Sequence, residues 1–280
     1  CWAAWTRPCP PMSEPARTGV AVTGAARIAY EVQGQGEPLL LLHGAEGTRH
    51  MFGDLVILLR ASFTCISFDQ RGCGETQAPL APYTADDIAD DACAVLAQAG
   101  FASAHVYGTS FGGIVAQSLA ARHPACVRAL VLGNTWASGQ VLPDVSPAVA
   151  RELAVLRQDR AANAQAIASF FYPQPFLRAH PWAVDRFRQA PATGDTQRLR
   201  AQCVATPVAA MAPAIAAPTL VVAGSEDRLV AADKTLALAR LIPRASGRSL
   251  PGAGHLPALQ MPAALAAEIT GFLSTHPDIR

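Results

Sequence analysis

Ser110 stands between glycines in the stretch GTSFG, residues 108–112, which follows an apolar run and precedes a helix-like segment. A serine hydroxyl attacks a carbonyl only when a base takes its proton and the backbone projects it toward the substrate. A sharp strand-to-helix turn gives that projection, and glycines two residues before and after the serine relieve its crowding. The stretch therefore predicts a nucleophilic serine. The alternative is a glycine-rich turn that only packs.

Two backbone N–H groups could hydrogen-bond the oxyanion that forms during such an attack. One belongs to Phe111, at the expected helix start, where N–H groups have no partner within the helix. The other belongs to Ala45, in the stretch LLLLHGAEG at 39–47, where an apolar run ends in a glycine-rich loop. We expect His43 in that loop to bond local backbone rather than to act as a base.

A carboxylate and an imidazole follow further along the chain. Asp227 ends the stretch AGSED after a predicted strand, and His255 lies in the glycine-flanked loop PGAGHL. With Ser110 they come in the order nucleophile, acid, base, which is one of the chain orders that serine–histidine–carboxylate triads take. Glu226, directly before Asp227, is a rival for the acid.

Short apolar runs alternate with amphipathic segments along most of the chain. The predicted strands are 18–23, 26–32, 38–42, 63–68, 105–107, 127–132 and 219–222, the first two as a hairpin. The predicted helices are 86–99, 111–122, 231–241 and 262–273. The alternation favours the α/β class, with a mainly parallel, doubly wound sheet covered by helices on both faces.

Residues 136–213 interrupt this alternation. They are rich in aromatic residues and proline, are otherwise helical in composition, and fall between two predicted strands. We predict an inserted helical cap here, on an α/β core formed by 18–135 and 214–280. Within the cap, Trp136 and Phe171 are candidate substrate contacts.

The N-terminal stretch, residues 1–17, is expected to be a disordered extension of this core. Residues 1–11 contain three prolines and no coherent apolar segment, so they do not match a signal peptide. We interpret Met12 as an ordinary start and residues 1–11 as an upstream extension with no folded role.

Composition excludes several classes of partner. The formal net charge is +1 and no basic stripe occurs, so we expect neither nucleic acid nor an anionic membrane as partner. The longest clean apolar run near the start, Leu39 to Leu42, is far below the roughly 20 residues of a membrane span. The seven cysteines are odd in number and form no C-x-x-C pair, which argues against a disulfide framework and a zinc site. We expect a cytoplasmic protein without metal or cofactor, and the alanine- and arginine-rich composition favours a bacterial source.

Five motifs together resemble those of the α/β-hydrolase fold superfamily, over residues 18–275. They are HGAEG at 43–47, DQRGCGET at 69–76, GTSFGG at 108–113, GSEDRLV at 224–230 and GAGH at 252–255. The stretches 83–96 and 113–135 are most similar to the branch of serine esterases and 3-oxoadipate enol-lactonases. The resemblance implies the fold and a set of site residues: Ser110 as nucleophile, His255 as base, Asp227 as the acid that orients it, and Ala45 and Phe111 as the oxyanion hole.

The stretch at 69–76 departs from the family pattern at one position. Cys73 stands where the family often has a histidine, so it is a candidate substrate contact at the pocket rim, with a packed thiol as the alternative. Asp69 and Arg71 are predicted to pair with each other and to fix this loop.

We predict a soluble, cofactor-free serine hydrolase that cleaves small carboxylic esters or lactones through an acyl-serine intermediate. Asp227 rather than Glu226 is expected as the acid because it stands three residues after Gly224, as in the family. Carbon–carbon bond hydrolases, perhydrolases and acyltransferases use the same triad and stay open as alternatives, as does a low-turnover small-molecule receptor of the same fold. The expected partner is a small ester or lactone, and the chain is either a monomer or a homodimer.

Overall fold

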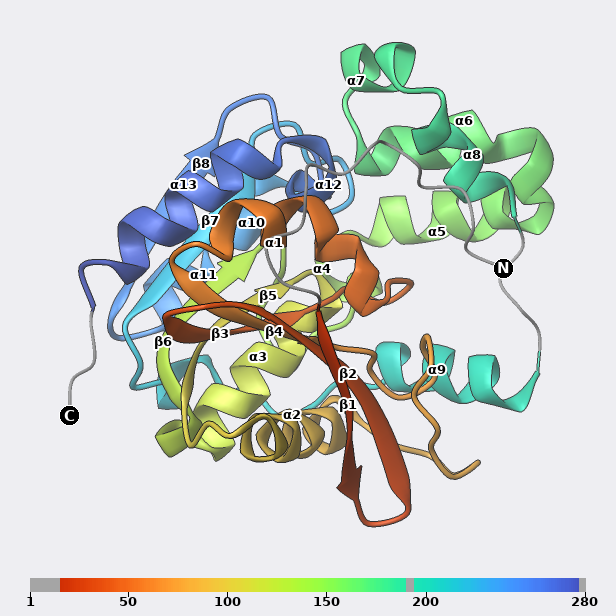
Figure 1. Ribbon diagram of the computed structural model, residues 1–280. Helices are drawn as coiled ribbons and strands as arrows, with labels where there is room; N and C mark the ends of the chain where they lie inside the picture. The colour runs from red at the N-terminus through yellow and green to blue at the C-terminus, as the bar shows by residue number, and fades with distance from the viewer. Residues whose placement is uncertain (1–15, 190–193, 277–280) are drawn as a thin grey trace.

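One sheet runs through the protein and carries helices on both faces (Figure 1). The computed structural model describes residues 16–189 and 194–276. The strands are β1 (Arg17–Thr23), β2 (Ala26–Gly34), β3 (Glu37–Leu42), β4 (Phe63–Phe68), β5 (Ala104–Thr109), β6 (Val127–Gly133), β7 (Thr219–Gly224) and β8 (Ala245–Leu250). The α-helices are α1 (Gly53–Leu59), α2 (Ala85–Ala99), α3 (Phe111–Arg122), α4 (Leu142–Val145), α5 (Pro147–Leu156), α6 (Arg160–Phe171), α7 (Gln174–Ala179), α8 (Trp182–Arg188), α9 (Asp195–Ala205), α10 (Ala232–Leu236), α11 (Leu238–Leu241), α12 (Pro257–Gln260) and α13 (Pro262–Leu273).

The eight strands lie in the order β1-β2-β4-β3-β5-β6-β7-β8. β2 is antiparallel to both of its neighbours, and all the other pairs are parallel. The apolar runs that form β3 to β7 are almost entirely buried, as expected for strands covered on both faces. The prediction of a mainly parallel α/β sheet is confirmed.

The parallel strands bring distant loops to one edge of the sheet. Leu42 in β3 pairs with Gly108 in β5, and Gly108 pairs with Leu132 in β6. The loops that follow these strands therefore begin side by side. Ligands of such sheets bind at this carboxyl edge.

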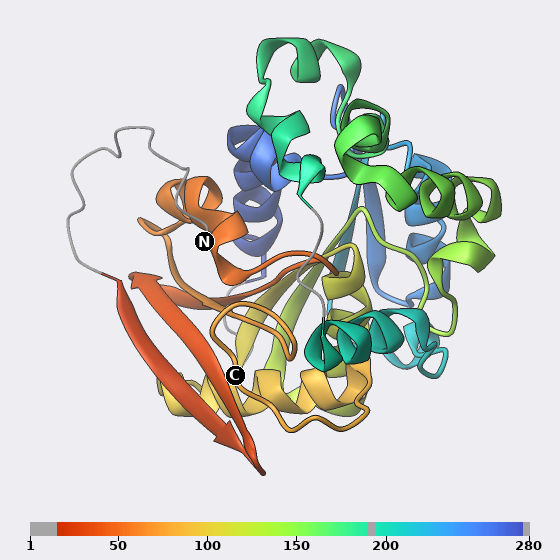
Figure 2. The ribbon, with the colours of Figure 1, turned by 90° about the vertical axis from the view of Figure 1, so that its right-hand side faces the viewer.

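Helices cover the two faces of the sheet in pairs. α1 packs with α13 on one face, and α2 packs with α3 on the other (Figures 1 and 2). α2 begins at Ala85, where the backbone N–H of Thr84 donates to the Asp87 carboxylate at 2.7 Å. It ends at Gly100, which has φ 94°, a left-handed conformation that glycine adopts without strain.

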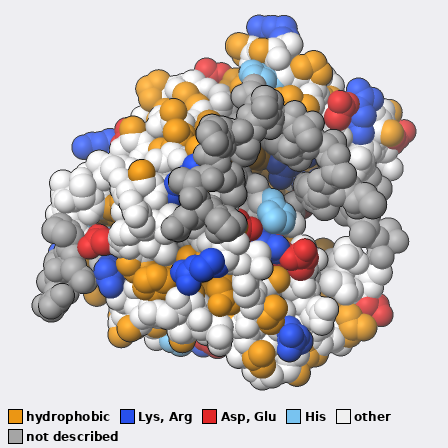
Figure 3. All heavy atoms as spheres, viewed as in Figure 1, with side chains coloured by type: hydrophobic (Ala, Val, Ile, Leu, Met, Phe, Trp, Pro, Cys, Tyr) orange, Lys and Arg blue, Asp and Glu red, His pale blue; other side chains and the backbone are white. Residues whose placement is uncertain are grey.

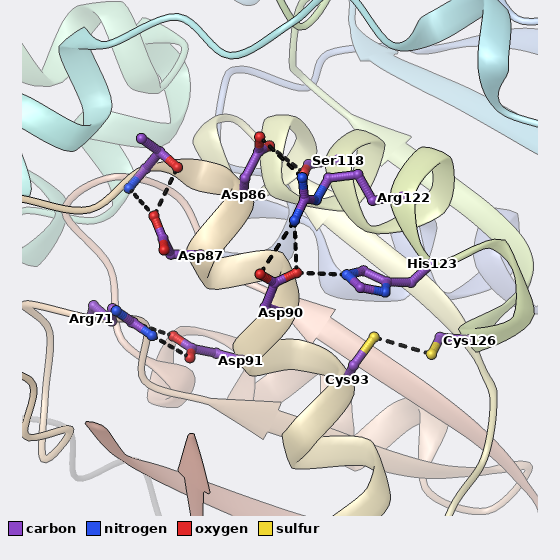
Figure 4. Close-up of polar contacts among 11 residues, drawn as sticks. Arg71, Asp86, Asp87, Asp90, Asp91, Cys93, Ser118, Arg122, His123 and Cys126 are labelled. Atoms are coloured by element: carbon purple, nitrogen blue, oxygen red, sulfur yellow. Dashed lines mark hydrogen bonds and ion pairs between the residues drawn. The ribbon is translucent and has the colours of Figure 1, made fainter. Parts of the chain in front are cut away.

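Polar contacts join α2 to α3 and to the turn after it (Figure 4). Asp90 accepts hydrogen bonds from Arg122 at 3.1 Å and from His123 at 2.6 Å. The Sγ atoms of Cys93 and Cys126 lie 3.1 Å apart, and both thiols are free. These contacts hold the outer end of α3, whose first residue follows the predicted nucleophile.

Two elements near the C-terminus differ from the sequence prediction. The predicted helix 231–241 is two short helices, α10 and α11, which meet at Ala237. β8 was missed because its sequence, ASGRSL, has no apolar alternation. It is an edge strand, half exposed, and its backbone pairs with β7 alone.

Helices α4 to α9 all fall between β6 and β7 in the chain. α6 packs against α8, whereas α9 lies apart from α5–α8, beside α2 (Figures 1 and 2). We call residues 136–213 the inserted segment, and its status as a separate cap stays a prediction. β1 begins at Arg17, so the last residue of the predicted extension 1–17 belongs to the sheet, and residues 1–15 lie outside the described residues.

Charges are interspersed over the face shown in Figure 3, where basic, acidic and apolar side chains alternate. This mixture agrees with the net charge of +1. Among the helices that the structure describes, none has both the length and the apolar character needed to cross a bilayer.

Candidate active site

Ser110 occupies a strained turn between β5 and α3. Its φ of 54° and ψ of −126° are unfavourable for any residue with a side chain. The backbone holds it there: the Ser110 N–H donates to the carbonyl of Gly133 at 3.0 Å, and the Thr135 hydroxyl donates to the Ser110 carbonyl at 2.7 Å. Such strain is typical of functional sites, where the surrounding packing maintains it.

The glycines around Ser110 are required by close backbone packing. A Cβ atom on Gly108 would lie 2.4 Å from the carbonyl oxygen of Gly112. A Cβ atom on Gly112 would lie 2.1 Å from the carbonyl oxygen of Leu42. The turn thus places the start of α3 directly against the end of β3, and only hydrogen fits at these positions.

The structure brings Ser110, His255 and Asp227 together from three loops. His255 Nε2 lies 2.9 Å from the Ser110 hydroxyl oxygen, and His255 Nδ1 lies 2.8 Å from Oδ2 of Asp227. The His255 side chain is 1% exposed, and its backbone N–H donates to the carbonyl of Phe171 at 2.8 Å. The inserted segment therefore helps to hold the loop that carries the imidazole.

Four donors converge on the buried carboxylate of Asp227. The backbone N–H groups of Leu229 and Val230 each donate to Oδ1 at 2.9 Å. Oδ2 accepts from His255 and, at 2.8 Å, from the side-chain amide of Asn134. These four bonds fix the orientation of the carboxylate, with Oδ2 directed at the imidazole.

Asn134 follows β6 and was not singled out from the sequence. Its amide also donates to the carbonyl of Gly254 at 3.1 Å, so it connects Asp227 to the loop that carries His255. Its φ of 48° is a left-handed conformation that asparagine tolerates better than most residues. A polar residue after a buried strand, at the carboxyl edge of the sheet, was the available signal. The rival carboxylate, Glu226, is exposed.

The two predicted oxyanion donors belong to the residue after Ser110 and to a loop packed against it. Phe111 is the first residue of α3, and its ring is buried. Ala45 lies in the loop after β3, where a Cβ atom on the neighbouring Gly44 would be 3.4 Å from Cβ of Ser110. The loop at 43–47 is therefore packed against the serine.

His43 bonds local backbone, as predicted. Its Nδ1–H donates to the carbonyl of Gly44 at 2.8 Å, and its Nε2 accepts from the backbone N–H of Gln70 at 3.1 Å. Burial and the nearby charge of Arg200 lower the pKa of His43 to about 4. His43 is therefore neutral at physiological pH and braces the loop through one fixed tautomer.

This lowered pKa predicts that acid destabilises the protein through His43. The folded-state pKa of about 4 lies below the ordinary 6.5, so between these values the unfolded chain binds a proton that the folded protein does not. Stability that is complete above pH 6.5 should fall toward pH 4, by on the order of 3 kcal/mol from this group. Urea unfolding of the wild type and His43→Gln across this range should give a flatter pH profile for the variant. Parallel profiles would contradict the assignment.

The three predicted substrate contacts have different surroundings. Phe171 lies edge-on to the His255 ring with 5.7 Å between centroids. Trp136 is 6% exposed and its indole N–H donates to the carbonyl of Gln140, so it is part of the buried core. Cys73 is half-buried, and burial raises the pKa of its thiol. Contact with substrate stays a prediction for all three.

The predicted pair of Asp69 and Arg71 is wrong. Asp69 instead forms a buried ion pair with Arg49 and accepts from the Arg49 backbone N–H at 2.8 Å. Arg71 forms a bidentate pair with Asp91 on α2, at 2.7 and 2.8 Å (Figure 4). A tight turn, in which the Cys73 N–H donates to the carbonyl of Gln70, directs the two side chains apart.

Metal ligation finds no support in the parts of the chain described, residues 16–189 and 194–276. No group of three or more His, Cys, Asp or Glu side chains in these ranges is arranged to hold a metal ion.

Comparison with known proteins agrees with this arrangement. The sequence profile of the alpha/beta hydrolase fold family matches residues 37–262. A protein of Variovorax paradoxus, provisionally named carbamate hydrolase RutD, is 30% identical over 259 residues, which cover 88% of this chain and 96% of the relative. The 3-oxoadipate enol-lactonase 2 of Acinetobacter baylyi is 27% identical over 205 residues, 71% of this chain and 76% of the relative.

A solved structure is similar along nearly the whole chain. The thermophilic esterase of Thermogutta terrifontis, determined with malate bound, superposes with a TM-score of 0.78 at 26% identity. The match covers 93% of this chain and all of the esterase. With a family match over most of its length and relatives named for hydrolysis, the chain belongs to the alpha/beta hydrolase fold family and is a hydrolase.

Proposed function

We propose that this hydrolase cleaves small carboxylic esters or lactones through an acyl-serine intermediate on Ser110. The observation that carries the proposal is the continuous hydrogen-bond chain from Ser110 through His255 to Asp227, with distances of 2.9 and 2.8 Å. Nucleophile and base are within proton-transfer distance, and the base is oriented by a third group, which is the arrangement that activates a serine.

The first half of the reaction forms the acyl-enzyme. His255 Nε2 accepts the hydroxyl proton as the Ser110 oxygen bonds to the carbonyl carbon. The imidazolium that forms faces the Asp227 carboxylate, which stabilises its charge. The tetrahedral oxyanion accepts hydrogen bonds from the N–H groups of Ala45 and Phe111. Collapse of this intermediate breaks the bond to the alcohol, which takes the proton from His255.

The second half repeats these steps with water. His255 takes a proton from water as the water oxygen attacks the acyl carbon, and the proton then returns to the serine oxygen. An ester plus water gives an acid and an alcohol. A lactone plus water gives one hydroxy acid, because the leaving alcohol stays attached to the acyl group.

The surroundings of the site favour a small substrate. Ser110 is 9% exposed and His255 is 1% exposed, so little of either is open to solvent. Phe171 of the inserted segment lies against the His255 ring and stacks on Phe187 at 4.8 Å. An acyl or alcohol group of modest size, lying beside these apolar rings, suits this environment.

Carbamate hydrolysis is a second candidate, because the Variovorax paradoxus relative carries that provisional name at 30% identity. A carbamate carbonyl can be attacked by the same serine and stabilised by the same oxyanion donors. The products separate the two: a carbamate ester plus water gives an alcohol and a carbamic acid, and the carbamic acid breaks down to carbon dioxide and an amine or ammonia. Products also distinguish carbon–carbon cleavage, perhydrolysis and acyl transfer. A low-turnover receptor would bind its ligand and release no product.

Covalent labelling combined with a substrate panel tests the proposal. A fluorophosphonate probe should label the wild type on Ser110, and Ser110→Ala should lose both the label and turnover. The panel contains short-chain nitrophenyl esters, simple lactones and an aryl carbamate. Ser274→Ala, at an exposed serine beyond α13, is the matched control and should behave as wild type. Undiminished labelling of Ser110→Ala, or tight binding without turnover in the wild type, would overturn the proposal.

A further inference from the structure

Arg200 is a buried cation that the proposed reaction has not yet used. It lies on α9 in the inserted segment, beside α2 rather than with α5–α8 (Figure 2). The residue is only 6% exposed, and its side chain reaches the loop at 43–47 that packs against Ser110.

The Arg200 guanidinium contacts both residues proposed to supply the oxyanion donors. Nε donates to the carbonyl of Ala45 at 3.1 Å, and the group lies 4.8 Å from the ring centroid of Phe111. Nη2 donates to the side-chain oxygen of Gln70 at 2.9 Å and lies 3.5 Å from the carbonyl oxygen of Gly44. One side chain from α9 therefore touches both halves of the oxyanion hole.

Peptide geometry connects these contacts to the direction of the Ala45 N–H. That N–H belongs to the peptide group whose carbonyl is that of Gly44, and in a planar trans peptide the two bonds point in opposite directions. His43 and Arg200 both approach the Gly44 carbonyl oxygen. Fixing the carbonyl on one side fixes the N–H on the other, and a charged donor also polarises the N–H into a stronger one.

The environment of the Arg200 guanidinium indicates a role other than filling space in the core. A buried guanidinium costs several kcal/mol unless it is paired. Within the described ranges Arg200 forms no ion pair; its partners are carbonyl oxygens, and Nη1 is buried without a hydrogen-bond partner. Its positive charge therefore meets carbonyl oxygens rather than a paired carboxylate, beside the loop where the oxyanion would form.

We propose that Arg200 is a positioning residue that aims the Ala45 N–H and supports Phe111, so that both donors meet the oxyanion. The inference rests on the proposed function of Ser110. It assigns to α9 a part in stabilising the transition state, although α9 supplies none of the reacting groups.

Substitution of Arg200 by Met, which is similar in length but uncharged, tests this role. We expect kcat for the best ester substrate to fall about 100-fold, because small displacements of oxyanion donors are costly, while KM changes less than about threefold. Affinity for a trifluoromethyl ketone, which forms an anionic tetrahedral adduct with serine, should fall in parallel with kcat. Affinity for the neutral alcohol product should stay within about threefold, because the alcohol has no carbonyl or negative charge for the oxyanion donors and Arg200 to meet.

Two further variants keep the test decisive. Arg198→Met, at an exposed arginine of the same helix paired with Asp195, is the matched control and should keep wild-type kcat. If Arg200→Met fails to fold, two variants keep a cation at 200: Arg200→Lys loses the fixed geometry of the guanidinium, and Gln70→Leu loses the bond from Arg200 together with the bond that the Gln70 amide donates to the His43 carbonyl at 2.7 Å. Each should then lower kcat and ketone affinity together, by about tenfold.

The outcomes separate this inference from the proposed function. A wild type without fluorophosphonate-sensitive turnover would refute the function of Ser110, and the role of Arg200 with it. A wild type that turns over, with Arg200 variants whose kcat stays within about threefold, would overturn the inference alone. An equal loss of ketone and product affinity would also overturn it, because that pattern indicates general disruption of the pocket.

Discussion

Replacing Asp227 with asparagine is expected to lower kcat for ester hydrolysis about 10⁴-fold, the scale seen when a triad histidine takes the wrong tautomer. Two donors meet each carboxylate oxygen of Asp227. An asparagine offers only one acceptor oxygen, so its NH₂ group must face two donors in either orientation. Directed at His255, the NH₂ leaves the proton on Nε2, which can no longer accept one from Ser110. Directed at Leu229 and Val230, it opposes two N–H groups and disrupts the loop.

The neighbouring carboxylate provides the control for this variant. Glu226→Gln makes the same chemical change one residue earlier, at an exposed side chain, and should keep kcat within about twofold. Steady-state kinetics and a circular dichroism spectrum of both variants complete the measurement. A large loss of kcat in Glu226→Gln, with Asp227→Asn nearly unaffected, would show that Glu226 and not Asp227 is the acid.

Gly112→Ala, which adds one methyl group, is expected to lower the stability of the protein more than any other glycine-to-alanine change next to Ser110. The added Cβ would lie 2.1 Å from the carbonyl oxygen of Leu42 and 2.5 Å from that of His43. Both are backbone atoms, which cannot rotate away as a side chain can. We expect a loss of about 3 kcal/mol in the free energy of unfolding, and slower labelling of Ser110 because the loop after β3 must move away from it.

Gly271→Ala is the matched control within helix α13. A Cβ atom there meets nothing within 4 Å, and the backbone is helical. Alanine should therefore be neutral or stabilise the protein by about 0.5–1 kcal/mol. Urea unfolding and the rate of fluorophosphonate labelling measure both variants. Equal stabilities for the two variants would show that the contact between α3 and β3 yields more easily than its distances imply.

The sheet was predictable because its signals are local. β3 to β7 are short apolar runs followed by turn residues, and such a run identifies a buried strand wherever it lies. The stretch around Ser110 was predictable for a related reason, since close backbone packing permits only glycine at fixed offsets. β8 gave no such signal, because a polar edge strand is defined by the backbone of β7 beside it.

Contacts across the fold were not predictable in the same way. Asn134 reaches a carboxylate 93 positions away, and Arg200 reaches the carbonyl of Ala45 across 155 positions. No pattern near either residue records its partner. Asp69 and Arg71 show the converse error, because residues two positions apart looked paired while the turn after them sends each to a distant partner.

The bond between the His255 backbone and the carbonyl of Phe171 limits how this enzyme could diversify. Exchange of the segment between β6 and β7 is an obvious route to a new specificity, by recombination or by design. Here such a transplant would also remove a support of the loop that carries His255, the proposed general base, so a change of specificity could also change proton transfer. A viable chimera must end a helix so that it reproduces the carbonyl acceptor at 171, whatever side chain stands there.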